Sequence, residues 1–259
     1  MPGGGALARG LRASVLWRLA SIALVLGAWE VAGRIPVSFA FPSFSATAGA
    51  FVAAVADGSL LRAYLTTLEP LVIGLALCAT VGVLTGIAMG LARPAEWLLA
   101  PVFVVMQAAP MAALIPLITF VYGIGLVAKV LAVVVLAAPV IVLNAYKAVR
   151  TVSPSLIEMC RSFQGTRRQE IVKIILPAAS PVIFAGLRLG VAAGFIGIVL
   201  AELLITPTGI GDLITYSASI ADYPTMYAVI ASIIVVAGVT VSLLERAETR
   251  FFRPEANRR

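Results

Sequence analysis

The sequence has 259 residues, of which 61% are apolar and 12% charged, and its formal net charge is +7. Because a soluble domain usually carries about 25% charged residues, this composition excludes an ordinary soluble protein. It predicts several apolar segments, each long enough to cross about 30 Å of hydrocarbon. The sequence contains no histidine, which excludes His-based catalysis and His-ligated metal sites. We expect no catalytic residue, no metal site and no nucleic-acid partner.

The first predicted membrane span covers about residues 15–33, after a basic segment. A cleaved signal peptide is the alternative, since basic residues also precede its apolar core. We favour a retained span, because the apolar run Leu19–Ala32 is long for a signal peptide and Trp29-Glu30 is a poor cleavage context. A loop of about 30 residues follows, in which proline and glycine break regular structure.

Five more spans are predicted, at about residues 65–92, 97–121, 127–146, 180–205 and 224–245. Prolines in the third span predict kinks, although ordinary bundle packing explains any single one of them. The predicted organisation is all-α, with six transmembrane helices. Its parts are an N-terminal tail (1–14), a first span with its outer loop (15–64), a core of five spans containing loop 147–177 (65–246), and a basic tail (247–259).

The distribution of basic residues predicts the orientation. With a cytoplasmic N-terminus, the inner segments hold fifteen lysines and arginines, and the outer segments hold only Arg34, Arg62 and Lys129. Basic residues accumulate on the cytoplasmic side of membrane proteins. We therefore expect a multi-pass membrane protein with both termini and residues 147–175 in the cytoplasm. Cys160 lies in that loop and Cys78 in a span, so no disulfide is expected.

The segment Ser153–Pro181 predicts two short helices. Ser153 is placed to cap the first helix, with Pro154 at its first position, and Ser155 with Glu158 offers a competing capping box. Gln164-Gly165 is expected to break this helix, because glycine tolerates the left-handed conformation of a tight turn.

The second helix of this segment is expected to begin at a capping box formed by Thr166 and Gln169 and to run to about Ile175. Pro177 would then stop or kink it before the fifth span. The first helix carries an apolar stripe at helical spacing, made of Leu156, Ile157, Cys160 and Phe163. From physical chemistry alone, this amphipathic helix lies on anionic lipid, forms a solvated loop or docks a soluble partner.

This segment resembles the EAA loop of ABC-importer permeases. The pattern is Glu-Ala-Ala, three residues, Gly, nine residues, Ile, one residue and Leu-Pro. Glu158 takes the glutamate position, Met159 and Cys160 replace the alanines, and Ile174, Leu176 and Pro177 match the end of the motif. The chain departs from the pattern at the glycine, because Gln164 stands there and Gly165 follows one residue later.

The resemblance extends from about Pro101 to the C-terminus. Segments Pro110–Pro116, Tyr122–Lys129 and Gly186–Arg188 are similar to the nitrate/sulfonate/taurine branch, as are Ala201-Glu202 and the Gly209–Gly211 turn. The resemblance implies a type I ABC-importer permease fold in a bacterial inner membrane and a translocation pathway for a small anion such as a sulfonate, taurine, nitrate or bicarbonate. A pyrimidine-like or other small organic solute is the alternative substrate.

The resemblance also implies the partners. These are two ATPase subunits, a second permease copy and a periplasmic or lipid-anchored binding protein, all working at membrane lipid. The sequence contains no phosphate-binding loop, so ATP and Mg²⁺ belong to the ATPase and this chain is a transport subunit without a cofactor or enzymatic activity of its own.

The residues implied in ATPase coupling are Glu158, Cys160, Arg161, Gln164, Gly165, Arg167, Leu176 and Pro177. Glu158 would pair with an ATPase arginine or cap its own helix.

Polar residues in or near the spans are the candidates for lining the pathway, because such residues usually face the bundle interior. We select Gln107, Asn144, Arg188 and Glu202, and we add the apolar Met111 as a fifth candidate. For Asn144 a helix–helix hydrogen bond is the favoured alternative. For Arg188 the alternative is snorkelling to inner headgroups, and for Glu202 a gate or a binding-protein contact.

Asp212, Asp222 and Tyr223 on the last outer loop are further candidates for meeting the binding protein.

Two other functional classes are the alternatives to a permease subunit. An ion-coupled secondary transporter would require buried carboxylates at the midplane, for which Glu69 and Glu202 are the candidates. A membrane scaffold would not require the EAA-like loop.

Overall fold

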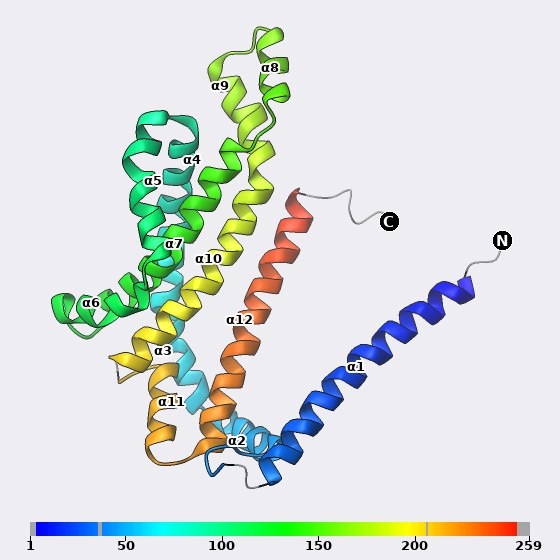
Figure 1. Cartoon of the computed structure of the whole chain (residues 1–259). Coiled ribbons are helices and arrows are strands. Elements are labelled where there is room, and N and C mark those ends of the chain that lie inside the picture. Colours follow the sequence, from blue (N-terminus) through cyan, green and yellow to red (C-terminus); the bar gives the residue numbers. More distant parts are fainter. Residues whose placement is uncertain (1–3, 36–37, 206, 253–259) are drawn as a thin grey trace. The chain divides into compact units, whose positions relative to one another are not determined.

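The computed structural model describes residues 4–35, 38–205 and 207–252, which form helices and no strand (Figure 1). The helices up to the middle of the chain are α1 (Gly4–Arg34), α2 (Phe44–Ala56), α3 (Ser59–Leu77), α4 (Val83–Leu91), α5 (Arg93–Ala108), α6 (Ile115–Tyr122) and α7 (Leu126–Arg150). The later helices are α8 (Pro154–Ser162), α9 (Arg167–Gln169), α10 (Leu176–Leu204), α11 (Ile210–Ser219) and α12 (Tyr223–Phe252). Short π turns join α3 to α4 (Cys78–Gly82) and α9 to α10 (Glu170–Ile175), and a 3₁₀ turn (Met111–Leu114) precedes α6.

The chain divides into two compact units. One comprises Met1–Leu60 with Ile214–Ala231, and the other Leu61–Leu213 with Ser232–Arg259. The second unit contains the EAA-like segment and all five predicted pathway residues.

Four continuous helices are long and apolar enough to cross a membrane: Ser59–Leu91, Leu126–Arg150, Arg167–Leu204 and Tyr223–Arg250. They correspond to the predicted second, fourth, fifth and sixth spans. A fifth crossing is available if α5 and α6 form one broken span. Helix α1 covers the predicted first span but is not in this set, which was drawn from the described residues only. The number six therefore stays a prediction.

The third predicted span, 97–121, is not one kinked helix. Helix α5 ends at Ala108, and the next helical segment, Ala112–Tyr122, leaves it at an angle of 88°. Pro110 stands in this break with ψ 73°, outside helical conformation. Its missing N–H cannot continue the hydrogen-bond ladder. Pro101 lies inside α5 without ending it, so only the second proline of this stretch breaks the span.

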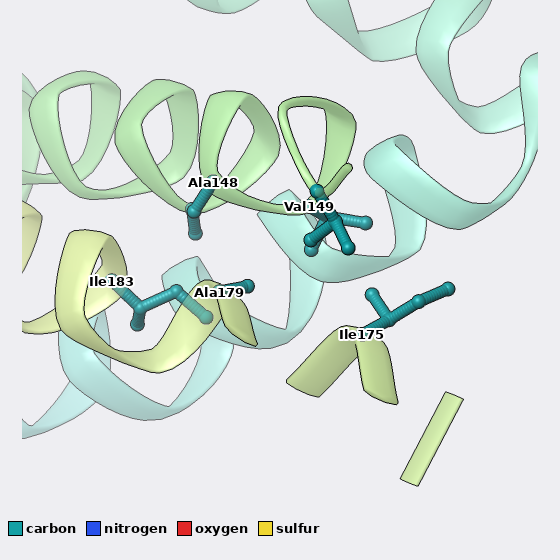
Figure 2. Packing of buried hydrophobic residues seen from close by; sticks show 7 residues of the cluster. Ala148, Val149, Ile175, Ala179 and Ile183 are labelled. Atoms are coloured by element: carbon teal, nitrogen blue, oxygen red, sulfur yellow. The ribbon is translucent and has the colours of Figure 1, made fainter. Parts of the chain in front are cut away.

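Helices α7 and α10 form the centre of the second unit. At one end of the pair, Ala148 and Val149 of α7 pack against Ala179 and Ile183 of α10, with Ile175 beside them (Figure 2). Further along, a Cβ added at Gly197 would stand 2.8 Å from the Ala132 carbonyl oxygen. Small residues on α10 therefore let the two backbones approach closely, as is common between membrane helices.

The first unit contains a helix that the sequence analysis assigned to a loop. Helix α2 begins directly after Pro42, with Ser43 as its N-cap accepting from the Ala46 backbone N–H at 3.3 Å. Trp29 of α1 donates its indole N–H to the Pro42 carbonyl at 3.1 Å. Its ring also meets that of Phe44, with ring centres 5.6 Å apart. Pro42, which in the sequence indicated a loop, therefore lies just before the start of helix α2.

Candidate functional site

The EAA-like segment projects beyond the adjoining ends of α7 and α10 (Figure 1). Helix α8 begins at Pro154, as predicted. The competing capping box does not form, because the Ser155 hydroxyl instead lies 2.7 Å from that of Ser153. Among the described residues, no hydrogen bond or ion pair engages the exposed Glu158 carboxylate, so Glu158 does not cap its own helix.

The turn after α8 corrects the prediction for Gly165. Gln164 takes the left-handed conformation, with φ 56°, and Gly165 does not. The Gly165 N–H donates to the Cys160 carbonyl and the Gln164 N–H to that of Arg161, each at 2.9 Å. These two bonds form a Schellman motif, which places the left-handed residue at Gln164. Gly165 is required for space, since an added Cβ would stand 2.8 Å from the Cys160 carbonyl oxygen.

The predicted capping box at the second helix is confirmed. The Thr166 backbone N–H donates to Gln169 Oε1 at 2.8 Å, and the Gln169 backbone N–H donates to Thr166 Oγ1 at 3.3 Å. Pro177 was predicted to stop or kink this helix, and the stop does not occur, because the helical run continues from Arg167 to Leu204. The π turn at Glu170–Ile175 lies directly before Leu176 and Pro177 and interrupts the regular ladder where proline lacks its N–H.

The apolar stripe of α8 divides into two faces. Ile157 packs against the core formed by α7 and α10. Leu156, Met159 and Phe163 instead leave 39%, 46% and 83% of their surfaces exposed. These three positions are separated by three and four residues, so they share one face of a helix. An exposed apolar face on a charged loop indicates a contact surface.

Glu170 is a residue whose importance the sequence analysis missed. A charged residue in a polar, basic segment is expected at the surface, but Glu170 is 3% exposed. Arg161 Nε lies 3.2 Å from its carboxylate, and Arg167 pairs with the same carboxylate. Both arginines remain more than half exposed. The network therefore connects α8 and α9 to the helical run that becomes α10. The sequence did contain a signal for one of these pairs, because oppositely charged residues three positions apart on a helix, such as Arg167 and Glu170, can form an ion pair.

At the other end of α10, the Glu202 carboxylate is buried in a polar cluster. It accepts from Lys129 Nζ at 2.7 Å, from Thr67 Oγ1 at 2.8 Å and from the Gly211 N–H at 3.1 Å. Glu202 is 2% exposed and Lys129 4%. The cluster joins α3, α7 and α10 to the start of α11. Since all these contacts are internal to the unit, they support a packing role for Glu202.

The remaining pathway candidates differ in their surroundings. Gln107 lines a depression of about 240 Å³ at the break between α5 and α6. The Asn144 amide donates to the Val140 carbonyl within its own helix at 2.7 Å, and Arg188 lies 3.3 Å from Glu245 and 3.7 Å from Glu248. The side chain of Met111 lies outside the described residues.

The sequence matches the family described as binding-protein-dependent transport system inner membrane component over residues 79–252. The permease protein SsuC of Bacillus subtilis, whose name assigns it to aliphatic sulfonates transport, is 29% identical over 86% of this chain and 83% of its own length. The riboflavin transport system permease protein RibX of Chloroflexus aurantiacus is 31% identical over 83% of this chain and 81% of its own length.

A solved structure shares the fold. The inward-facing MetNI methionine ABC transporter matches with a TM-score of 0.60 at 20% sequence identity, over 75% of this chain and 94% of the matched chain. The all-α, type I permease-like architecture is thereby confirmed.

Proposed function

Because this chain belongs to the family of binding-protein-dependent transport system inner membrane components, we propose that α8 is the element through which its ATPase partner moves the spans. The chain is a multi-pass membrane permease subunit of an ABC importer, and ATP hydrolysis belongs to the partner. Family membership removes the rival hypotheses of a secondary transporter and of a scaffold. Glu69, one of the two carboxylates that an ion-coupling site would need, is exposed.

The observation that carries the coupling proposal is the divided stripe of α8. Ile157 anchors the helix to the core of α7 and α10, while Leu156, Met159 and Phe163 present an apolar face away from that core. Burial of these side chains in a cleft of a partner would stabilise the complex by roughly 25 cal/mol for each Å² of apolar surface removed from water. The free carboxylate of Glu158 offers a charged contact at the same surface.

A movement of α8 would reach the spans through two connections. One is the covalent turn at Gln164–Gly165, and the other is the pairing of Arg161 and Arg167 with Glu170 at the start of the long helix. Both arginines are also among the residues that the resemblance implies in ATPase coupling. Both side chains are more than half exposed, so they can contact a partner while they remain paired with Glu170.

Phe163→Ala together with Met159→Ala tests the docking face. We expect loss of co-purification with the ATPase and loss of uptake, with membrane insertion unchanged, and we expect the same from Glu158→Arg and from Gly165→Val. Phe39→Ala is the matched control, because Phe39 is fully exposed but lies in the segment between α1 and α2. Normal complex formation and uptake by the α8 variants would contradict the proposal.

For the translocation pathway we propose the depression at the α5–α6 break. It contains Gln107 on a wall that is otherwise apolar, including Met106, Pro110, Leu136 and Pro139. Non-helical backbone at membrane depth is tolerated where it lines a cavity. Of the other candidates, Asn144, Arg188 and Glu202 have internal partners, so we assign them to packing. Met111 remains a proposed lining residue, because it lies in the break between α5 and α6.

We propose a small organic or inorganic anion, such as a sulfonate, as the substrate, on the similarity to SsuC. The similarity to RibX supports an uncharged or larger organic solute as the second candidate, and none of the described residues on the wall of the depression at Gln107 is charged. Binding measurements on the cognate binding protein with sulfonates, nitrate, bicarbonate and riboflavin distinguish the two. Tight binding of riboflavin with no response to the anions would overturn the anion assignment.

We further propose that two copies form the pathway and that both termini lie in the cytoplasm. Exposed apolar side chains of α5 and α6, including Val105 and Phe120, provide surface for a second copy or for lipid. The excess of basic residues in the segments assigned to the inside supports the orientation. Reporter fusions at each terminus test it, and an active periplasmic reporter at either end would contradict it.

A further inference from the structure

A second cavity lies beside α8, at the ends of α4, α5 and α7. Its volume is about 420 Å³, and it opens to solvent. The charged residues on its wall are Arg93, Arg150, Arg161, Arg167, Glu158 and Glu170. Four guanidinium groups therefore face two carboxylates, which leaves the wall with an excess of positive charge.

Arg93 and Arg150 are the two arginines of this wall that Glu170 does not engage. Arg161 and Arg167 are both engaged by Glu170. Arg150 approaches Glu96 only at 3.7 Å, and the same carboxylate already accepts the Tyr146 hydroxyl at 2.6 Å. Within the described ranges, no hydrogen bond or ion pair engages the Arg93 guanidinium.

The position of these two arginines places the cavity at a membrane boundary. Arg93 follows the span Ser59–Leu91, and Arg150 is the last residue of the span Leu126–Arg150. Trp97, about one helical turn after Arg93, is 76% exposed. Tryptophan is enriched at the level of lipid headgroups. Basic pockets between membrane helices at this level bind phosphate-bearing headgroups.

We propose that this cavity is a binding site for a phosphate-bearing anion, held by Arg93 and Arg150. The planar guanidinium group offers paired N–H donors that match phosphate oxygens. The anion has two possible sources, the headgroup of an anionic phospholipid and free phosphate. A bound anion would connect α5 and α7 beside α8 and hold the loop against the spans. The site is separate from the α5–α6 depression, but its wall includes Glu158, which also belongs to the proposed docking surface of α8.

The test uses the purified permease–ATPase complex in a neutral detergent. Phosphatidylglycerol, phosphatidylcholine and inorganic phosphate are titrated separately, and binding is followed by native mass spectrometry and by the shift in melting temperature. We expect Arg93→Gln with Arg150→Gln to weaken binding of the anionic probe on the order of tenfold or more, because two charge-assisted hydrogen-bonding groups are lost. Arg168→Gln is the control, since this exposed arginine is in the same loop but not on the cavity wall.

Selective binding of phosphatidylglycerol identifies a lipid headgroup, and binding of inorganic phosphate identifies a free anion. Either result supports the site if the double variant loses it and Arg168→Gln keeps it. Wild-type binding by the double variant, equal loss in the control or no binding of either anionic probe would overturn it. If the double variant does not fold, Arg93→Gln alone serves, with a several-fold loss expected. ATPase co-purification from the same samples tests the coupling proposal separately.

Discussion

The two ends of the helical run Arg167–Leu204 each hold a buried carboxylate, but in different surroundings. Glu202 at one end is paired with Lys129, and both side chains are almost completely excluded from water. Glu170 at the other end is equally buried, yet its partners Arg161 and Arg167 are more than half exposed. Removing one member of a buried pair leaves a charge without water, whereas an exposed arginine that loses its partner is still hydrated.

The two ends differ in how easily the partners of the buried carboxylate can exchange it for water. The Glu202 cluster joins three helices and the start of α11 through contacts that have no replacement in solvent. The Glu170 network joins short helices whose arginines can exchange the carboxylate for water at small cost. The coupling proposed for α8 would use the second arrangement, and the first arrangement suits the end of the bundle that stays packed.

The largest effect is expected from Lys129→Met, which leaves the Glu202 carboxylate buried without its cation. Breaking a buried pair in this way destabilises by roughly 3–5 kcal/mol. The apparent melting temperature of the purified permease measures it. Lys129→Met combined with Glu202→Gln should recover part of the loss, because no buried charge is left. A double variant as unstable as the single one would show that the ion pair does not dominate this end.

An intermediate effect is expected from Glu170→Gln, since the two released arginines can turn to solvent. We expect a loss of about 1–2 kcal/mol in stability, within the usual range for a buried polar group. Transport should fall more than ATP hydrolysis in the assembled complex, because the connection between α8 and α10 is weakened. Uptake and ATPase assays on the same preparation measure this ratio. A loss as large as that of Lys129→Met would remove the distinction between the two ends.

The smallest effect, and one of opposite sign, is expected from Gln164→Gly. The left-handed conformation costs an L-residue roughly 1–2 kcal/mol relative to the right-handed one, and glycine avoids that penalty. We expect a gain of about 1 kcal/mol at most, because glycine also gains entropy in the unfolded chain. Melting temperature and ATPase co-purification should both be maintained or raised. Gly165→Ala is the contrasting change, and it should destabilise because the Cys160 carbonyl occupies the space.

Much of the architecture followed from local patterns. Long apolar runs predicted the helices now seen as α7, α10 and α12, and the spacing of Thr166 and Gln169 predicted a capping box that the structure contains. Both signals act within a few residues of the chain. The resemblance of Glu158–Pro177 to the EAA loop predicted the family, and the family match over residues 79–252 confirms it.

Other features depended on neighbours that are distant in sequence. The break at Pro110 could not be predicted from the sequence, because a proline does not always end a helix. Prolines also lie inside helices of this chain, at Pro70, Pro139 and Pro181. Helix α2 was missed because prolines were read as loop signals, although a helix starts directly after one of them.

The sequence by itself determined that this chain is an all-α membrane permease with a charged, amphipathic loop before its fifth predicted span. Hydropathy, capping and motif spacing are local properties that the chain carries without its fold. Only the tertiary structure decided that Gln164 rather than Gly165 is left-handed, and that Glu170 and Glu202 are buried with partners. The cation for Glu202 comes from a residue 73 positions away. Burial is set by what packs around a side chain, and no local pattern records it.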